Sequence, residues 1–160
     1  MLIKPTYSID GDVTDIDLDA LYESGLRGLI FDLDSTLMES KTGVITSAVG
    51  DWLGKARPRF KMIVLSNNKR LDYLDAVSLV LDMKVIGHAA KPFRSGFTQA
   101  LTELALPPEE VAIIGDRPLT DILGGQMSGL STVLVKPLKT IQDPAWKSFL
   151  RNLERSLIRF

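Results

Sequence analysis

The sequence predicts an α/β fold: a doubly wound, mainly parallel sheet of five strands with helices on both faces. Short runs of apolar residues recur along the chain, and stretches with helical spacing of apolar residues separate them. Continuous apolar strands that alternate with helices are typical of parallel sheets covered on both faces. Right-handed crossovers then place the functional site beyond the carboxyl ends of the strands.

Five segments carry the strand pattern. The first contains Leu29, Ile30 and Phe31 in succession, and the third is the weakest because it offers little more than Val85 and Ile86. The predicted strands are residues 28–32, 62–65, 84–86, 111–114 and 132–135. The predicted helices between them are residues 44–56, 69–81, 93–106 and 120–128. We find no repeat or linker, so we expect residues 1–160 to form a single domain.

The amino-acid composition excludes several kinds of functional site. The chain has no cysteine, which excludes disulfides, thiolate zinc sites and a cysteine nucleophile. It has one histidine, so a bound metal must take mainly oxygen ligands. The net charge of -1 provides no general positive field, so we expect no nucleic-acid partner. No apolar run reaches a membrane span and no signal-peptide pattern is present, so we expect a cytoplasmic protein.

Two carboxylates follow the first predicted strand, at Asp32 and Asp34. Ionised carboxylates this close repel each other and resist desolvation, so a fold that retains them needs a compensating cation. Taken alone, the pair could equally be a helix cap and a turn residue. The pair nevertheless points to a magnesium-assisted site at the carboxyl edge of the sheet.

Polar residues also follow the next strands. They are Ser66 and Asn67 after the second strand, Lys91 after the third, and Asp116 and Asp121 after the fourth. Each has a purely structural alternative, such as a helix cap or a solvated charge. Because the carboxyl ends of parallel strands converge, we expect all of these side chains to meet at one edge of the sheet.

Together, the polar residues that follow the predicted strands resemble the motifs of a known protein family. The residues that carry it are Asp32-x-Asp34-x-Thr36, Ser66, Lys91 and Gly115-Asp116-x-x-x-x-Asp121. They resemble the four signature motifs of the haloacid dehalogenase (HAD) superfamily of phosphohydrolases. Residues 32–37, 65–68 and 120–125 further resemble the YqeG-type branch (subfamily IIIA), which includes phosphatidylglycerophosphate phosphatases. Two residues depart from the pattern: Ser35 replaces the usual Asn, and Arg117 stands where Gln is common.

The resemblance implies a HAD fold without a cap domain and a role for each residue. Asp32 is expected to be the nucleophile that forms an aspartyl phosphate, and Asp34 the general acid and base. An extended backbone would project both side chains to the same side. Magnesium is expected on the Asp32 carboxylate, the Asp34 backbone carbonyl and Asp116.

The other motif residues are expected to bind and support the phosphoryl group. Ser66, with backbone amides at a helix start near Asn67, should donate hydrogen bonds to its oxygens. Lys91 should add a positive charge, and Asp121 should orient Lys91 or a metal-bound water. Thr36 is expected to support the site without touching the substrate.

An uncapped site suits a phosphate on a large substrate. The resemblance favours hydrolysis of phosphatidylglycerophosphate to phosphatidylglycerol. Two alternatives remain open: a phosphatase for soluble phosphomonoesters or phosphoproteins, and a phospho-acceptor signalling domain without turnover. Signalling domains of that kind carry their acceptor Asp after the third strand, and residues 87–91 contain none.

The C-terminal segment predicts a basic amphipathic helix at about residues 143–160. Its apolar stripe comprises Trp146, Phe149, Leu150, Leu153, Leu157 and Phe160, and its basic ridge comprises Lys147, Arg151, Arg155 and Arg159. Such a helix can lie in an anionic membrane interface, which predicts peripheral membrane contact. The alternative is a terminal helix that docks its apolar stripe on the core.

Overall fold

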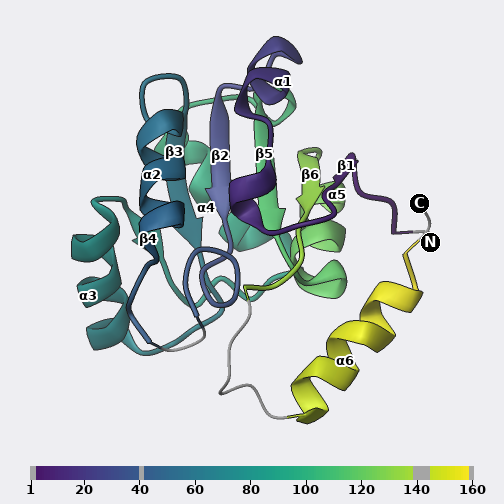
Figure 1. Cartoon of the computed structure of the whole chain (residues 1–160). Helices are drawn as coiled ribbons and strands as arrows, with labels where there is room; N and C mark the ends of the chain where they lie inside the picture. Colours follow the sequence, from purple (N-terminus) through teal and green to yellow (C-terminus); the bar gives the residue numbers. More distant parts are fainter. Residues whose placement is uncertain (1–2, 40–41, 139–144, 159–160) are drawn as a thin grey trace.

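The computed structural model describes residues 3–39, 42–138 and 145–158, and it confirms the α/β class (Figure 1). All strand pairs are parallel, and the order in the sheet is β1-β6-β5-β2-β3-β4. The strands are β1 Tyr7–Ser8, β2 Gly28–Phe31, β3 Lys61–Leu65, β4 Val85–Ile86, β5 Val111–Gly115 and β6 Ser131–Leu134.

In the described part of the chain, the sheet has six strands, where the sequence predicted five. The additional strand, β1, pairs with β6 in the register Tyr7 to Val133. The N–H of Ile9 donates to the carbonyl of Leu134 at 2.9 Å, which extends this pairing by one residue. A two-residue strand has no periodicity of its own, so it forms here because the edge of β6 supplies its hydrogen-bond partners.

Helices cover both faces of the sheet (Figure 1). The helices α1 Leu18–Glu23, α2 Ser47–Ala56 and α3 Leu71–Leu81 pack on one face, and α4 Arg94–Leu104 and α5 Leu123–Met127 lie on the other. Along β2, Phe31 packs in the first layer and Ile30 in the second. Burial on both faces is the reason the strands are continuously apolar.

Several predicted helix boundaries were wrong by a few residues. The helix α2 begins at Ser47 rather than at residue 44, because the Thr46 side chain caps it by accepting a hydrogen bond from the N–H of Val49 at 3.2 Å. The single helix predicted for residues 120–128 is a π-helical turn, η3 (Pro118–Ile122), followed by α5. The C-terminal helix α6 spans Ala145–Ser156, within the predicted range.

The topology places a site at the middle of the sheet. The chain leaves β2 toward β3 on one side, while β5 lies on the other side of β2. Connections that diverge in this way leave a crevice at the carboxyl ends of the two central strands. The described connections between strands contain single helices, short 3₁₀ or π turns and loops, with no inserted cap domain over that edge.

Two adjacent glycines allow α5 to pack closely on its neighbours. A Cβ atom at Gly125 would lie 2.3 Å from Cγ2 of Ile113, and one at Gly124 would lie 2.4 Å from Cε2 of Phe97. Both distances are too short for any side chain. The glycine pair therefore lets α5 approach β5 and α4, and α5 in turn fixes the position of the preceding turn η3.

We expect Gly125→Val to destabilise the protein by about 1–3 kcal/mol, because the added side chain overlaps Ile113. Gly54→Ala is the matched control: a Cβ at Gly54 meets nothing within 4 Å, so alanine should stabilise α2 by up to about 1 kcal/mol. Urea unfolding followed by circular dichroism measures both. A Gly125→Val protein as stable as wild type would contradict the close packing.

Candidate active site

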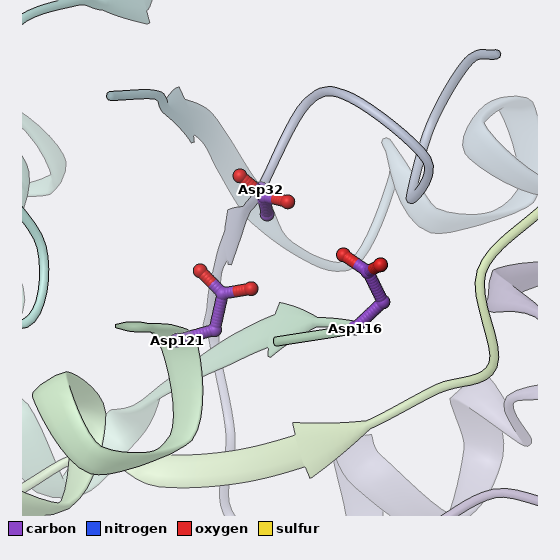
Figure 2. A group of neighbouring side chains, drawn as sticks. All are labelled: Asp32, Asp116 and Asp121. Atoms are coloured by element: carbon purple, nitrogen blue, oxygen red, sulfur yellow. The ribbon is translucent and has the colours of Figure 1, made fainter. Parts of the chain in front are cut away.

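Three carboxylates meet at the carboxyl ends of the central strands. Asp32 follows β2, Asp116 follows β5, and Asp121 lies in η3. One carboxylate oxygen from each lies within 4.8 Å of those of the other two, and Figure 2 shows the three side chains pointing toward one another. The predicted convergence of Asp32, Asp116 and Asp121 is thus present in the structure.

A buried lysine ties this cluster together. Nζ of Lys91 lies 2.7 Å from Oδ1 of Asp32 and 2.7 Å from Oδ1 of Asp121. Burial alone would lower the pKa of Lys91, but the carboxylates of Asp121 and Asp32 outweigh it, so the pKa lies above its ordinary value. Lys91 therefore remains positively charged, and its ammonium is in direct contact with Asp121, the residue predicted to orient Lys91 or a metal-bound water.

Asp121 reaches Lys91 because position 115 is a glycine. A Cβ atom at Gly115 would lie 2.2 Å from Oδ2 of Asp121, so any side chain there would displace this carboxylate. The N–H of Arg117 donates to the same oxygen at 3.2 Å. Glycine is therefore required at position 115 for a steric reason, because only glycine leaves room for the Asp121 carboxylate.

The cluster carries more negative than positive charge. Burial, together with the negative charge of Asp32, raises the pKa of Asp121, while Lys91 opposes the shift. One ammonium cannot balance three carboxylates in a largely buried site. The donor atoms are all hard carboxylate oxygens, so the cluster fits a divalent cation such as Mg²⁺.

The loop after β3 differs from the prediction in its local structure. The helix α3 begins at Leu71, so the amides near Asn67 belong to a loop and not to a helix start. Ser66 directly follows β3 and is buried. Its Oγ accepts a hydrogen bond from the N–H of Asn68 at 3.1 Å. This Ser-turn delays the helix, which the sequence alone did not indicate.

Asn67 fixes the backbone of Lys91. Its Oδ1 accepts from the N–H of Lys91 at 2.8 Å, and its Nδ2 donates to the Lys91 carbonyl at 3.2 Å. The Asn67 side chain thus joins the loops after β3 and β4 and positions Lys91.

Asp34 lies outside the three-carboxylate cluster. The strand β2 ends at Phe31, and a turn follows at Ser35, whose φ is 68°. Oδ1 of Asp34 accepts a hydrogen bond from the Tyr73 hydroxyl of α3 at 3.2 Å. Burial and the negative charge of Asp34 raise the pKa of Tyr73 to about 12, so this hydroxyl remains a donor at neutral pH.

Thr36 and Arg117 make the remaining contacts around Asp116. Oγ1 of Thr36 donates to Oδ1 of Asp116 at 3.4 Å. Nε of Arg117 donates to Oε2 of Glu154 at 3.0 Å, and its second amino group binds Oε1 of the same residue. Glu154 is a buried residue of α6, so this bidentate pair fastens α6 to the loop that carries Asp116.

Sequence reasoning missed Tyr73 and Glu154. Both act across long sequence separations, to Asp34 and Arg117 respectively, and neither lies in a recognisable motif. Glu154 in particular belongs to an amphipathic helix whose charged residues suggest a solvated face. The sequence feature that could have indicated the Arg117–Glu154 pair is Arg117 itself, which stands where Gln is common in the family.

Comparison with known proteins identifies the family. Residues 88–144 match the family model described as HAD-hydrolase-like. The chain is 32% identical over 141 residues to the protein named "Probable phosphatase YqeG" from Bacillus subtilis, with 88% of this chain and 81% of that protein covered. The chain belongs to the HAD-like hydrolase family.

Further relatives of this HAD-like protein come from photosynthetic organisms. It is 27% identical to phosphatidylglycerophosphate phosphatase 1 of Arabidopsis thaliana and 29% identical to that of Chlamydomonas reinhardtii, over 92% and 89% of this chain. The chain spans 45% and 56% of the lengths of these two proteins.

Solved structures share the fold. An uncharacterized protein from Listeria monocytogenes matches with a TM-score of 0.60 at 18% identity, covering 74% of this chain and 85% of that one. YfnB of Bacillus subtilis, whose structure is bound to magnesium, matches with a TM-score of 0.56 at 12% identity, covering 74% and 89%.

We expect Mg²⁺ to raise the melting temperature of the protein and EDTA to reverse the increase. A cation that binds the folded cluster at about 100 times its Kd adds about 2.7 kcal/mol of stability. Asp116→Asn should largely remove the response, whereas Asp10→Asn, which changes an exposed carboxylate outside the cluster, should not. Differential scanning calorimetry with and without Mg²⁺ measures this, and an unchanged melting temperature in wild type would contradict the metal site.

Proposed function

We propose that this HAD-like protein is a Mg²⁺-dependent phosphomonoester hydrolase that works through an aspartyl phosphate on Asp32. The observation that carries the proposal is the charge arrangement: Lys91 bridges Asp32 and Asp121, and Asp116 completes a carboxylate cluster at the carboxyl edge of the sheet. Membership of the HAD-like family and similarity to YqeG support it.

Accessibility favours Asp32 as the nucleophile. Its side chain is 15% exposed, whereas that of Asp121 is 0% exposed and Asp116 is 1% exposed. A substrate phosphate can therefore approach Asp32. Of the two buried carboxylates, Asp116 would bind the cation and Asp121 binds Lys91. The Asp32 carboxylate attacks phosphorus, the bond from phosphorus to the leaving oxygen breaks, and Lys91 neutralises charge on the phosphoryl oxygens.

Asp34 completes the cycle as general acid and then as general base. It donates a proton to the departing alkoxide in the first step and accepts one from the attacking water in the second. The water displaces Asp32 from phosphorus and releases inorganic phosphate. When bound to Asp32, Asp116 and the Asp34 carbonyl, Mg²⁺ would relieve the carboxylate repulsion and withdraw charge from the phosphoryl oxygens.

Tyr73 positions Asp34 for this proton transfer. Removing its hydroxyl should therefore matter most for substrates whose leaving group needs protonation. We expect Tyr73→Phe to lower kcat on an alkyl phosphate by about fivefold, the effect of one lost hydrogen bond, and to change kcat on 2,4-dinitrophenyl phosphate little. Steady-state kinetics on both substrates test this. An equal loss on both would indicate a general structural effect and contradict the positioning role.

We propose phosphatidylglycerophosphate as the substrate. The Arabidopsis and Chlamydomonas relatives carry that activity in their names, and the described chain has no inserted cap domain over the carboxyl edge. A site of this kind is accessible to a phosphate that remains attached to a bilayer. The product would be phosphatidylglycerol.

The C-terminal helix is proposed to contact the membrane. In α6, the side chains of Phe149, Leu150, Leu153 and Leu157 are exposed, so these members of the predicted stripe are not docked on the core. Among the described residues of α6, Glu154 binds Arg117, and Arg155 donates to the carbonyl of Val135. The side chains of Trp146, Lys147 and Arg151, and residues 159–160, lie outside the described part of the structure. No described helix is long and apolar enough to cross a membrane.

Phosphate release from phosphatidylglycerophosphate in mixed micelles tests this function. We expect Mg²⁺-dependent release that exceeds release from p-nitrophenyl phosphate and from soluble sugar phosphates. Asp32→Asn should lower the rate by more than about a thousandfold with an unchanged circular dichroism spectrum, while Asp10→Asn should remain active. Release from the soluble esters alone would overturn the lipid substrate, and near-normal activity of Asp32→Asn would overturn the mechanism.

A further inference from the structure

Three large apolar side chains are exposed at the edge of the sheet where the carboxylate cluster opens. Val44 is 66% exposed, Leu71 is 64% exposed and Phe93 is 68% exposed. Each lies on a segment that follows the carboxyl end of a strand: Val44 after β2, Leu71 after β3 and Phe93 after β4. We call Val44, Leu71 and Phe93 the rim surface.

Hydrogen bonds and a close contact hold the three segments side by side. Asn67 binds the backbone of Lys91, and the N–H of His88 donates to the carbonyl of Asn68 at 3.1 Å, which joins the loops before Leu71 and Phe93. A Cβ atom at Gly43 would lie 3.8 Å from Cε2 of Tyr73, so the chain next to Val44 lies beside the first turn of α3. The rim surface therefore borders the same opening as Asp32 and Lys91.

The charged neighbours of the rim surface are mainly basic. Lys69 and Arg70 precede Leu71 and are exposed, and exposed Arg94 follows Phe93. Two acidic residues also lie close by: exposed Asp75, one turn along α3 from Leu71, and Asp72, which lies 3.4 Å from Arg70 with both side chains more than 70% exposed. A pair this solvated is held weakly, so Arg70 is available to an anionic partner.

We propose that the rim surface docks the protein on an anionic lipid bilayer and turns the opening of the carboxylate cluster toward the lipid headgroups. The inference rests on the proposed lipid substrate. Aliphatic and aromatic side chains at the end of a loop or helix enter the interface between headgroups and acyl chains, while Lys and Arg beside them bind lipid phosphates. This orientation lets a headgroup phosphate reach Asp32 without leaving the bilayer.

The absence of cysteine permits a direct test of the orientation. Phe93→Cys is labelled with an environment-sensitive fluorophore and mixed with vesicles of phosphatidylcholine alone or with phosphatidylglycerol. Leu79→Cys is the matched control, because Leu79 is 84% exposed near the other end of α3, away from the rim surface. We expect a blue shift and an intensity increase at position 93 with the anionic vesicles only, and no change at position 79. No change at 93, or equal changes at both positions, would overturn the proposal.

Vesicle co-sedimentation of unlabelled variants gives a second readout. Leu71→Ser with Phe93→Ser should weaken binding to phosphatidylglycerol vesicles at least about tenfold, and Leu79→Ser with Val80→Ser should bind like wild type. Both proteins should hydrolyse p-nitrophenyl phosphate at the wild-type rate, which shows that they are folded. Unaltered vesicle binding by the rim variant would contradict the proposal. A second variant, Phe149→Ser with Leu153→Ser, removes exposed apolar side chains of α6. If this variant lost binding while the rim variant kept it, α6 and not the rim surface would dock the protein.

The binding assay contains no phosphatidylglycerophosphate, so it separates this inference from the proposed function. Loss of vesicle binding by the rim variant would support the docking surface even if the enzyme hydrolysed only soluble esters. Hydrolysis of phosphatidylglycerophosphate at the same rate by wild type and the rim variant in vesicles would support the lipid substrate and contradict the docking surface.

Discussion

The ammonium of Lys91, held between Asp32 and Asp121, is the interaction on which the rest of the site depends. It is buried, and it connects side chains carried after β2, β4 and β5, three elements that are distant in sequence. A buried charge is tolerated only when its partners are placed accurately. Much of the surrounding structure serves that placement: Asn67 fixes the Lys91 backbone, Gly115 admits Asp121, and the glycine pair of α5 holds the turn η3 in place.

The same constraint explains why the cluster favours a cation. Lys91 balances only part of the charge of three carboxylates that lie in a largely dry environment, and the remainder must be met by a metal or by protonation. Of the three carboxylates, Asp32 is the one that solvent reaches, and it is in direct contact with Lys91, as Asp121 is. Lys91 therefore both holds the cluster together and contacts the carboxylate proposed to react.

The fold and the cluster were predictable because a parallel sheet brings strand ends together whatever the sequence distance between them. That rule placed Asp32, Lys91, Asp116 and Asp121 correctly without any knowledge of contacts. It could not indicate that Asp34 lies outside the three-carboxylate cluster and accepts a hydrogen bond from Tyr73 of α3. It also could not reveal β1, which exists only as an addition to β6, or the pairing of Arg117 with Glu154 across 37 residues.

Reductive trapping of the phosphorylated enzyme tests the central claim most directly. Borohydride reduces an aspartyl phosphate to homoserine, so the protein is mixed with Mg²⁺ and a phosphomonoester, reduced, and mapped by peptide mass spectrometry. The account predicts homoserine at position 32, dependent on substrate and absent in Asp32→Asn. Homoserine at position 34 or 116, or no conversion during active turnover, would contradict it.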